Sequence, residues 1–236
     1  MKLLHVVQHT SAEFLGMIED HLEGRGIRFK YYRPFTEGGV LPERDLVQDG
    51  LVLLGGGPWG SAGGRDLPTL KQEVALAHAV LMRGWPVIGI GLGAQILAIA
   101  AGGRSDPTPL MFEVGRAHRT SPDALDGYLP DEFPFARYMR DWPVPPDYAT
   151  VHAVDGQSRP VLWQLGPSAF GFVGHPGLKV AMIEDLIMEF DESVADPAPM
   201  LGRLRGEQRA IEDALVPIMT GLVRRAGWME NGLGGC

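Results

Sequence analysis

The chain has 236 residues, of which 45% are hydrophobic and 21% are charged. This composition is typical of a soluble globular protein and excludes a disordered chain, a collagen-like repeat and a membrane bundle. Asp and Glu together number 29 against 21 Lys and Arg, so the net charge is -8. An acidic chain repels phosphate backbones, and we therefore expect no nucleic-acid partner.

The sequence also bears on compartment and cofactors. There is one cysteine, Cys236, which excludes an intrachain disulfide and a cysteine-based zinc site. We see no histidine spacing typical of a metal site, and we expect no cofactor. No apolar run approaches the roughly 18–20 residues that span a bilayer, and the N-terminus lacks the features of a signal peptide. A cytoplasmic protein without membrane contact is the expectation.

The first half of the chain alternates between two kinds of hydrophobic pattern. Short apolar or β-rich runs predict strands at 2–7, 27–32, 50–54 and 86–90, and helical spacing predicts helices at 12–22, 67–82 and 94–101. The runs at 50–54 and 86–90 are continuously apolar, as in strands buried on both faces. The order predicts an α/β fold with three layers, in which helices cover both faces of a mostly parallel central sheet.

The pattern changes after about residue 104. Short strand-like runs at 111–119, 133–138, 149–154, 159–165 and 169–174 are separated by Pro, Asp and Gly. We expect them to continue the same sheet as antiparallel or edge strands. A helix is predicted at 178–190, and another at about 207–226, followed by a flexible tail at 227–236. We expect one domain, 1–236.

Two glycine-rich turns follow predicted strands, at 53–61 (LLGGGPWGS) and at 87–95 (VIGIGLGAQ). Ligands of open α/β sheets bind outside the carboxyl ends of the strands. The second turn reads strand, tight turn, helix, which is the arrangement of a nucleophile elbow. The N-terminus of the following helix would stabilise an oxyanion there.

Three segments together resemble the class I (triad-type) glutamine amidotransferases, and most closely their stand-alone, GMP-synthase-like subgroup. PVIGIGLGAQILA (86–98) resembles the family motif G-I-C-L-G-x-Q, DGLVLLGGGPWGS (49–61) its G-G-P oxyanion loop, and SAFGFVGHPG (168–177) its G-x-Q-F-H-P-E. The resemblance covers roughly residues 45–190 and implies a flavodoxin-like α/β fold.

The same resemblance implies that two catalytic positions are lost. Family members attack the glutamine amide with a Cys that a His activates and a Glu orients. The Cys position is Gly91 here, the His is retained as His175, and the Glu position is Gly177. Glycine supplies neither nucleophile nor base, so the resemblance implies a protein that has lost glutamine hydrolysis and serves as a binding or partner subunit.

The remaining positions carry over through the resemblance. Gly57 and Leu92 match the residues whose backbone N–H groups form the oxyanion hole, which survives side-chain change. Gln95 matches a substrate-contacting residue, or else it is a capping or packing residue. Arg137 and Arg140 favour an anionic ligand, or else they are a solvated pair. The expected partners are a glutamine-like or small anionic ligand, a synthetase or other protein, and a second copy of the chain.

Alternative hypotheses remain open at this point. In one hypothesis the site is repurposed for other chemistry through His175 with a cofactor, a water or a partner's residue. In the other, His175 has no function and only packs at the sheet edge. Cys236 stands in as nucleophile, or else it is a surface thiol. Residues 89–94 also satisfy G-x-G-x-x-A, and Glu113 follows about 20 residues later. This spacing is typical of a dinucleotide-binding protein.

Overall fold

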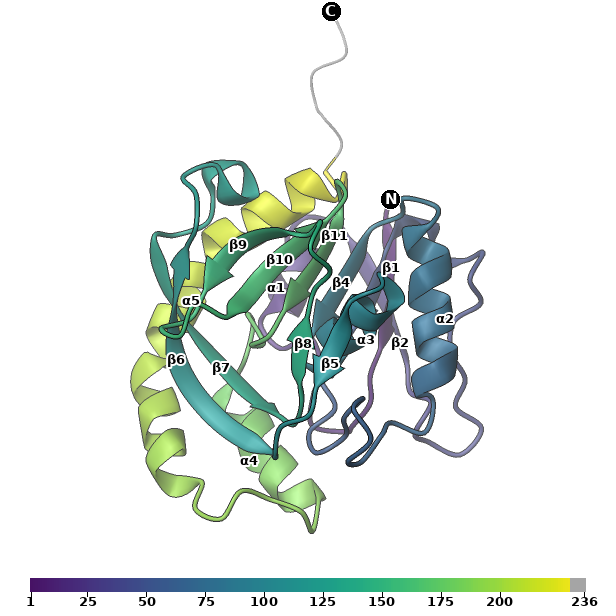
Figure 1. Ribbon diagram of the computed structural model, residues 1–236. Helices are drawn as coiled ribbons and strands as arrows, with labels where there is room; N and C mark the ends of the chain where they lie inside the picture. The colour runs from purple at the N-terminus through teal and green to yellow at the C-terminus, as the bar shows by residue number, and fades with distance from the viewer. Residues whose placement is uncertain (230–236) are drawn as a thin grey trace, which may run out of the picture.

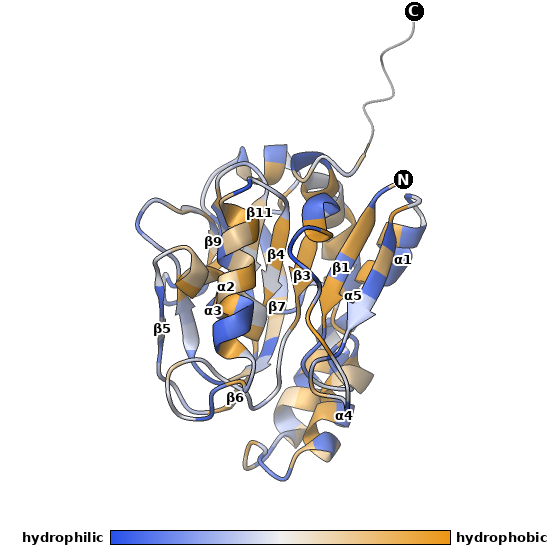
Figure 2. Ribbon diagram, turned by 90° about the vertical axis from the view of Figure 1, so that its right-hand side faces the viewer, coloured by the Kyte–Doolittle hydropathy of each residue, from blue (hydrophilic) through white to orange (hydrophobic). Residues whose placement is uncertain are grey.

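A nine-stranded sheet forms the centre of the computed structural model, which describes residues 1–229 (Figure 1). The strand order is β2-β1-β3-β4-β11-β10-β9-β6-β7. The first five strands in that order run parallel: β2 (Arg28–Tyr32), β1 (Leu3–Val7), β3 (Leu51–Leu53), β4 (Val87–Ile90) and β11 (Ala169–Phe172). Figure 2 shows hydrophobic residues along β1, β3 and β4, as expected of strands covered on both faces.

The other half of the sheet is antiparallel, as the sequence pattern predicts. It comprises β10 (Pro160–Leu165), β9 (Thr150–Val154), β6 (Met111–Arg119) and β7 (Glu132–Met139). A separate two-stranded sheet, β5 (Arg104–Asp106) with β8 (Trp142–Val144), was not predicted from the sequence. Two 3-10 turns lie at Val47–Asp49 and Ala124–Gly127.

Helices cover both faces, which confirms the three-layer α/β prediction. On one face α2 (Leu70–Leu81) and α3 (Leu92–Ala100) build a core of apolar side chains with the sheet. On the other face α1 (Ile18–Glu23), α4 (Val180–Glu189) and α5 (Ala198–Arg225) build a second core. No helix within residues 1–229 is both long and apolar enough to cross a membrane.

The N-terminal helix is shorter than the sequence predicts. A helix was expected over 12–22, but α1 begins only at Ile18, and residues 10–17 form a series of turns. Gly16 has a φ of 61°, a left-handed conformation that ends a right-handed helix and that glycine adopts without strain. The segment 10–17, which we call the strap, is thereby free to cross the carboxyl ends of the strands.

The C-terminal predictions also need correction. The last helix begins at Ala198, nine residues before the predicted 207, because proline is tolerated in a first helical turn. The predicted flexible tail begins at 227, yet Trp228 is buried against the core and its Nε1 donates to the Asp49 carbonyl at 2.6 Å. The rest of that predicted tail, 230–236 with Cys236, lies outside the described residues.

Candidate functional site

The turn between β4 and α3 has the geometry of a nucleophile elbow. Gly91 has φ 56° and ψ -114°, and its N–H donates to the Phe172 carbonyl at 2.8 Å. A Cβ built on Gly91 would lie 3.4 Å from the Gly55 Cα and 4.0 Å from the Met139 Sδ. A small side chain would therefore find room at position 91, and the cost of adding one lies mainly in the left-handed backbone.

The neighbouring glycines are needed for close packing. A Cβ on Gly93 would lie 2.0 Å from the Leu53 carbonyl oxygen, and one on Gly89 would lie 2.4 Å from the Gly93 carbonyl oxygen. Real atoms do not approach so closely, so the helix and the two strands meet only because both residues lack side chains. Gly89 and Gly93 are thus required for the close packing of the elbow.

The second glycine-rich turn points a backbone N–H into the site, and that donor is already occupied. Gly57, with a φ of 54°, donates its N–H to the Oε2 of Glu13 at 2.5 Å. Glu13 belongs to the strap and is only 5% exposed. A Cβ on Gly55 would lie 2.0 Å from the Glu13 Oε1, so glycine at 55 makes room for the carboxylate. The N–H of Leu92 lies in the first turn of α3, where no intrahelical acceptor exists.

Burial controls the ionisation of Glu13. Removal from water raises the pKa of Glu13 to about 7, against the opposing effects of the Gly57 N–H and of His9. Glu189 adds a smaller repulsion that also raises this pKa. The Glu13 carboxyl therefore titrates near neutrality, while an exposed Glu is fully ionised at that pH.

A buried ion pair lies behind the same loop. His9 Nε2 lies 2.7 Å from the Oε2 of Glu73, and His9 Nδ1 lies 3.0 Å from the carbonyl oxygens of Leu54 and Gly55. Burial opposes the charged form of His9, but the charge and hydrogen bond of Glu73 outweigh it, and the pKa of His9 is raised. Carbonyl and carboxylate oxygens only accept, so His9 is an imidazolium that donates from both nitrogens.

His175 is held as a neutral ring with both nitrogens in use. Its Nε2 donates to the Phe14 carbonyl at 2.8 Å, and its Nδ1 accepts from the Gly177 N–H at 3.1 Å. Burial lowers the pKa of His175 to about 4. A general base needs a free lone pair within reach of the proton it takes, and the lone pair of this ring already binds a backbone N–H.

Gly177 is a close contact point of the strap. A Cβ on Gly177 would lie 2.8 Å from Ile18 Cγ1 and 2.9 Å from Ile18 N, and a Cβ on Gly16 would lie 2.2 Å from the Gly177 carbonyl oxygen. Met17 also donates its N–H to that oxygen at 2.9 Å. A glutamate at 177 would require Ile18, the first residue of α1, and the Leu15 carbonyl of the strap to shift, because its Cβ would lie 2.8 Å from Ile18 Cγ1 and 3.1 Å from the Leu15 oxygen.

Gln95 is fully buried and ties two loops together. Its Oε1 accepts from the Ser61 hydroxyl at 2.6 Å, and its Nε2 donates to the Arg140 carbonyl at 2.7 Å. Arg140 donates from Nε to the Pro58 carbonyl at 2.6 Å and pairs with Glu192. The polar atoms of Gln95 and the hydroxyl of Ser61 thus hold the glycine-rich loop against the end of β7.

Arg137 is buried rather than solvated. Its guanidinium pairs with Glu113 on β6 at 2.8 Å and lies over the Trp142 ring at 4.8 Å; among residues 1–229, Nη1 finds no hydrogen-bond partner. The interpretation of Arg137 and Arg140 as a solvated pair is therefore wrong.

Glu113 lies on a strand that β11, β10 and β9 separate from β4, so it does not face the Gly89–Gly91 turn as a dinucleotide site requires.

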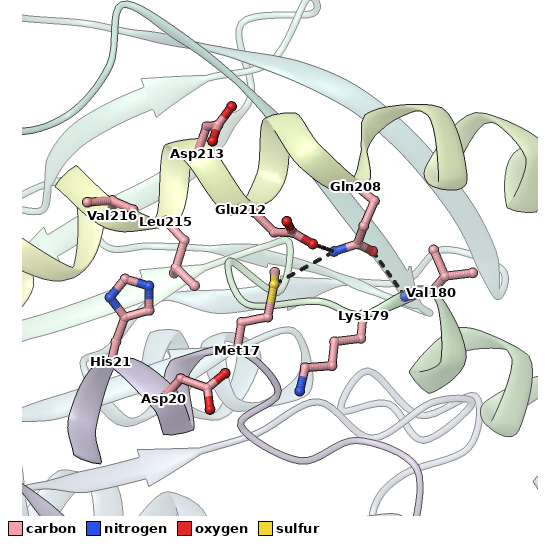
Figure 3. A pocket seen from close by; sticks show the side chains of 10 residues that line it. All are labelled: Met17, Asp20, His21, Lys179, Val180, Gln208, Glu212, Asp213, Leu215 and Val216. Atoms are coloured by element: carbon pink, nitrogen blue, oxygen red, sulfur yellow. Dashed lines mark hydrogen bonds between the residues drawn. The ribbon is translucent and has the colours of Figure 1, made fainter. Parts of the chain in front are cut away.

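The space left beside Gly91 is small. A cavity of about 10 Å³ is lined by Glu13, Gly91, Met139 and His175 among others, which is room for about one water molecule. A hollow of about 720 Å³ lies instead between α1 and α5 and is lined by Asp20, Lys179 and Glu212 among others, as Figure 3 shows. None of the residues predicted for the site lines that groove.

Within residues 1–229 no cluster of three or more His, Cys, Asp or Glu side chains is arranged to hold a metal ion.

Sequence reasoning missed the charged residues of this site. His9, Glu13 and Glu73 are all buried, and none was singled out as functional. A signal was present for two of them, since the polar run Gln8–Glu13 follows directly after a buried strand, where ligand-binding residues gather. Glu73 lies on an ordinary amphipathic helix, and its sequence carries no such signal.

Solved structures with a similar fold include glutamine amidotransferases. No protein-family model matches the chain. Among solved structures, a glutamine amidotransferase of Methylobacillus flagellatus superposes with a TM-score of 0.79 at 24% identity, covering 100% of this chain and 99% of its own. A glutamine amidotransferase of Thermotoga maritima gives a TM-score of 0.77 at 22% identity, covering 95% and 98%. The chain therefore has the fold of these glutamine amidotransferases.

A curated relative is similar in sequence as well. The glutamine amidotransferase-like protein YfeJ of Salmonella typhimurium is 28% identical over 201 residues, which cover 82% of this chain and 83% of the relative. The likeness extends over most of both proteins, beyond the three motifs.

Proposed function

We propose that this protein does not hydrolyse glutamine and that it acts as a non-catalytic partner subunit built on an amidotransferase-like fold. The observation that carries the proposal is the state of the elbow. The turn after β4 keeps the backbone of a nucleophile position, but Gly91 offers no atom that could attack an amide carbon. Without that atom no γ-glutamyl thioester forms at the turn.

The surroundings of Gly91 support the same conclusion. The His175 ring donates from one nitrogen and accepts at the other, so it has no lone pair left for a proton. The position matched to the orienting carboxylate is Gly177, where the strap leaves no room for a side chain. Restoring one catalytic group alone would therefore not rebuild the triad, since its members act as a unit.

The closed hollow favours a protein partner over a glutamine-like ligand. Sites for small ligands have volumes of roughly 300–1,000 Å³, against about 10 Å³ beside Gly91. A glutamine side chain cannot enter while Glu13 occupies the donor of the oxyanion loop. What the fold still presents is its surface, on which a synthetase or another protein would dock.

Two assays test this proposal. Ammonia release from L-glutamine by the purified full chain should match the rate without protein, and Cys236→Ser, which removes the chain's one thiol, should change nothing. Turnover at rates of ordinary amidotransferases would overturn the loss of catalysis. Affinity capture with the tagged full chain should yield a stoichiometric protein partner, and a chain that purifies alone under every condition would count against the partner role.

A further inference from the structure

The oxyanion loop holds a ligand supplied by the chain itself. The Glu13 carboxyl lies against the loop, with one oxygen 2.5 Å from the Gly57 nitrogen. The other oxygen occupies the place that a side chain on Gly55 would need. Glu13 arrives from the strap, 44 residues away in sequence from its donor. A carboxyl group is thus bound at a backbone donor that has no other partner among the described residues.

Two positive groups lie near this carboxyl, and Glu189 opposes them. The buried His9 imidazolium lies behind the same loop, donates to the carbonyls of Leu54 and Gly55, and is paired on its far side with Glu73. The N-terminus of α3, at Gly91 and Leu92, lies next to the loop. Its helix dipole adds a partial positive charge there. His175 is neutral and Glu189 is the remaining carboxylate that acts on Glu13. His9 and the Gly57 N–H offset part of the burial that raises the Glu13 pKa, so the hole accepts one carboxyl group without fully favouring its charged form.

The strap that carries Glu13 is held by a small set of hydrogen bonds. Glu189 on α4 accepts from the N–H groups of Ser11 at 2.9 Å and Ala12 at 3.1 Å, with its own side chain exposed. Tyr31 on β2 accepts from the Leu15 N–H through its hydroxyl oxygen at 2.9 Å. Further anchors are Gln8 Nε2, which donates to the Thr10 and Ser11 carbonyls, and the contacts of Phe14 and Met17 with the 175–177 segment. Glu189 makes no hydrogen bond with the Gly55–Gly57 loop, although its charge contributes to the raised pKa of Glu13.

We propose that the hole under the Gly55–Gly57 loop is a carboxylate-binding site that the chain fills in cis with Glu13, and that small free carboxylates bind there once Glu13 or the strap is displaced. The inference deepens the proposed function and rests on it, because a working glutaminase would need this hole empty. The tethered group has a high effective concentration at its own site, so free carboxylates do not compete with it in the wild-type protein.

The test is chemical complementation of a cavity. Glu13→Ala removes the tethered carboxyl, and sodium acetate is the probe, with sodium chloride at equal ionic strength as the reference. At about ten times its Kd, acetate should raise the melting temperature of the variant by about 2–4 °C more than chloride does, and should leave the wild-type temperature unchanged. A crystal structure of the variant in acetate should place the acetate on the Gly57 N–H.

A second variant protects the test against misfolding of the first. Glu189→Gln weakens the strap anchor, and Glu184→Gln, on the same helix and paired with Arg205, is the matched control. Hydrogen–deuterium exchange over residues 10–17 should speed up in Glu189→Gln alone, and the response to acetate should appear in that variant and not in the control.

The outcomes separate clearly. An acetate effect equal to that of chloride in both Glu13→Ala and Glu189→Gln would overturn the inference, as would a wild-type response as large as that of Glu13→Ala. If Glu13→Ala does not fold, the Glu189→Gln result decides alone. Glutamine turnover by the wild-type protein would overturn the proposed function whatever acetate does, so the two failures are distinguishable.

Discussion

The carboxyl group of Glu13 accepts a hydrogen bond of 2.5 Å from the backbone N–H of Gly57. This contact joins the strap after β1 to the glycine-rich loop after β3, where the resemblance to amidotransferases predicts an oxyanion hole. Around it the nucleophile position is glycine, and the histidine ring is bound at both nitrogens. The site is thus organised around an internal occupant, the Glu13 carboxyl.

Restoring a thiol at the elbow should not restore catalysis. Gly91→Cys has room for its Cβ but must adopt a φ of 56°, which should cost about 1–2 kcal/mol of unfolding free energy. Ammonia release from glutamine should stay at the wild-type level, because Glu13 and His175 keep their present partners. Urea unfolding and the ammonia assay measure the two effects.

The control for that substitution is Gly84→Cys. Gly84 is exposed, has a φ of 66°, and a Cβ there meets no described atom within 4 Å. It should show a similar strain cost but rapid alkylation by a thiol reagent, whereas a thiol at 91 should react slowly. Glutamine turnover in Gly91→Cys would contradict the view that the whole site, and not one atom, is lost.

Adding a methyl group at position 177 should destabilise the fold through the strap. Gly177→Ala places Cβ within 2.9 Å of Ile18, and overpacking of this kind should cost about 1–3 kcal/mol. Gly156→Ala is the matched control, since its Cβ meets nothing within 4 Å among the described residues. Equal unfolding free energies for the two variants would refute the proposed role of Gly177 in seating the strap.

Breaking the buried pair behind the loop should be the most costly of these changes. Glu73→Ala leaves the His9 imidazolium without the carboxylate that lies 2.7 Å away, and loss of one partner of a buried pair costs about 3–5 kcal/mol. Asp213→Ala removes an exposed carboxylate 3.9 Å from Arg209, and such a change should stay within about 0.5 kcal/mol. A urea midpoint for Glu73→Ala close to that of Asp213→Ala would show that the pair is dispensable.

The stability of the protein should depend on pH through His175. Its pKa is about 4 in the folded chain and 6.5 when exposed, so between these values the unfolded state binds more protons. The stabilisation is complete above pH 6.5 and is lost as the pH falls toward 4, by up to about 3 kcal/mol. Unfolding free energies of the wild type and of His175→Asn, measured across this range, should diverge, with the steeper loss in the wild type. Parallel curves would mean that the ring is accessible and charged.

Local patterns in the sequence predict the layers of the fold well. Continuously apolar runs such as 50–54 and 86–90 predict buried parallel strands, and β3 and β4 lie there. The strands β5 and β8 were missed because RSD and WPV are three residues long and carry no alternation. The helix predicted at 12–22 is too long because Phe14, Leu15, Ile18 and Leu22 fit helical spacing. Gly16, which lies between Leu15 and Ile18, has a φ of 61° and keeps the helix from extending toward residue 12.

The candidate site is only partly predictable in the same way. The two glycine-rich turns mark where the backbone bends, and the structure brings Gly91 against Gly55 and places Glu13 between the hollow beside Gly91 and the N–H of Gly57. The role of Glu13 depends on a contact across 44 residues, and the ionisation of His9 depends on Glu73, which is 64 residues away. Contacts between residues so far apart in the sequence leave no pattern in the neighbouring residues, so they are recognised only in the folded structure.

The proposed loss of catalysis requires that the elbow between β4 and α3 form no covalent intermediate with glutamine. The most direct measurement is the intact mass of the wild-type full chain after incubation with L-glutamine and acid quenching. The mass should equal that of the untreated chain at every time point. An added γ-glutamyl group on any residue would contradict the account, and peptide mapping would then identify the nucleophile.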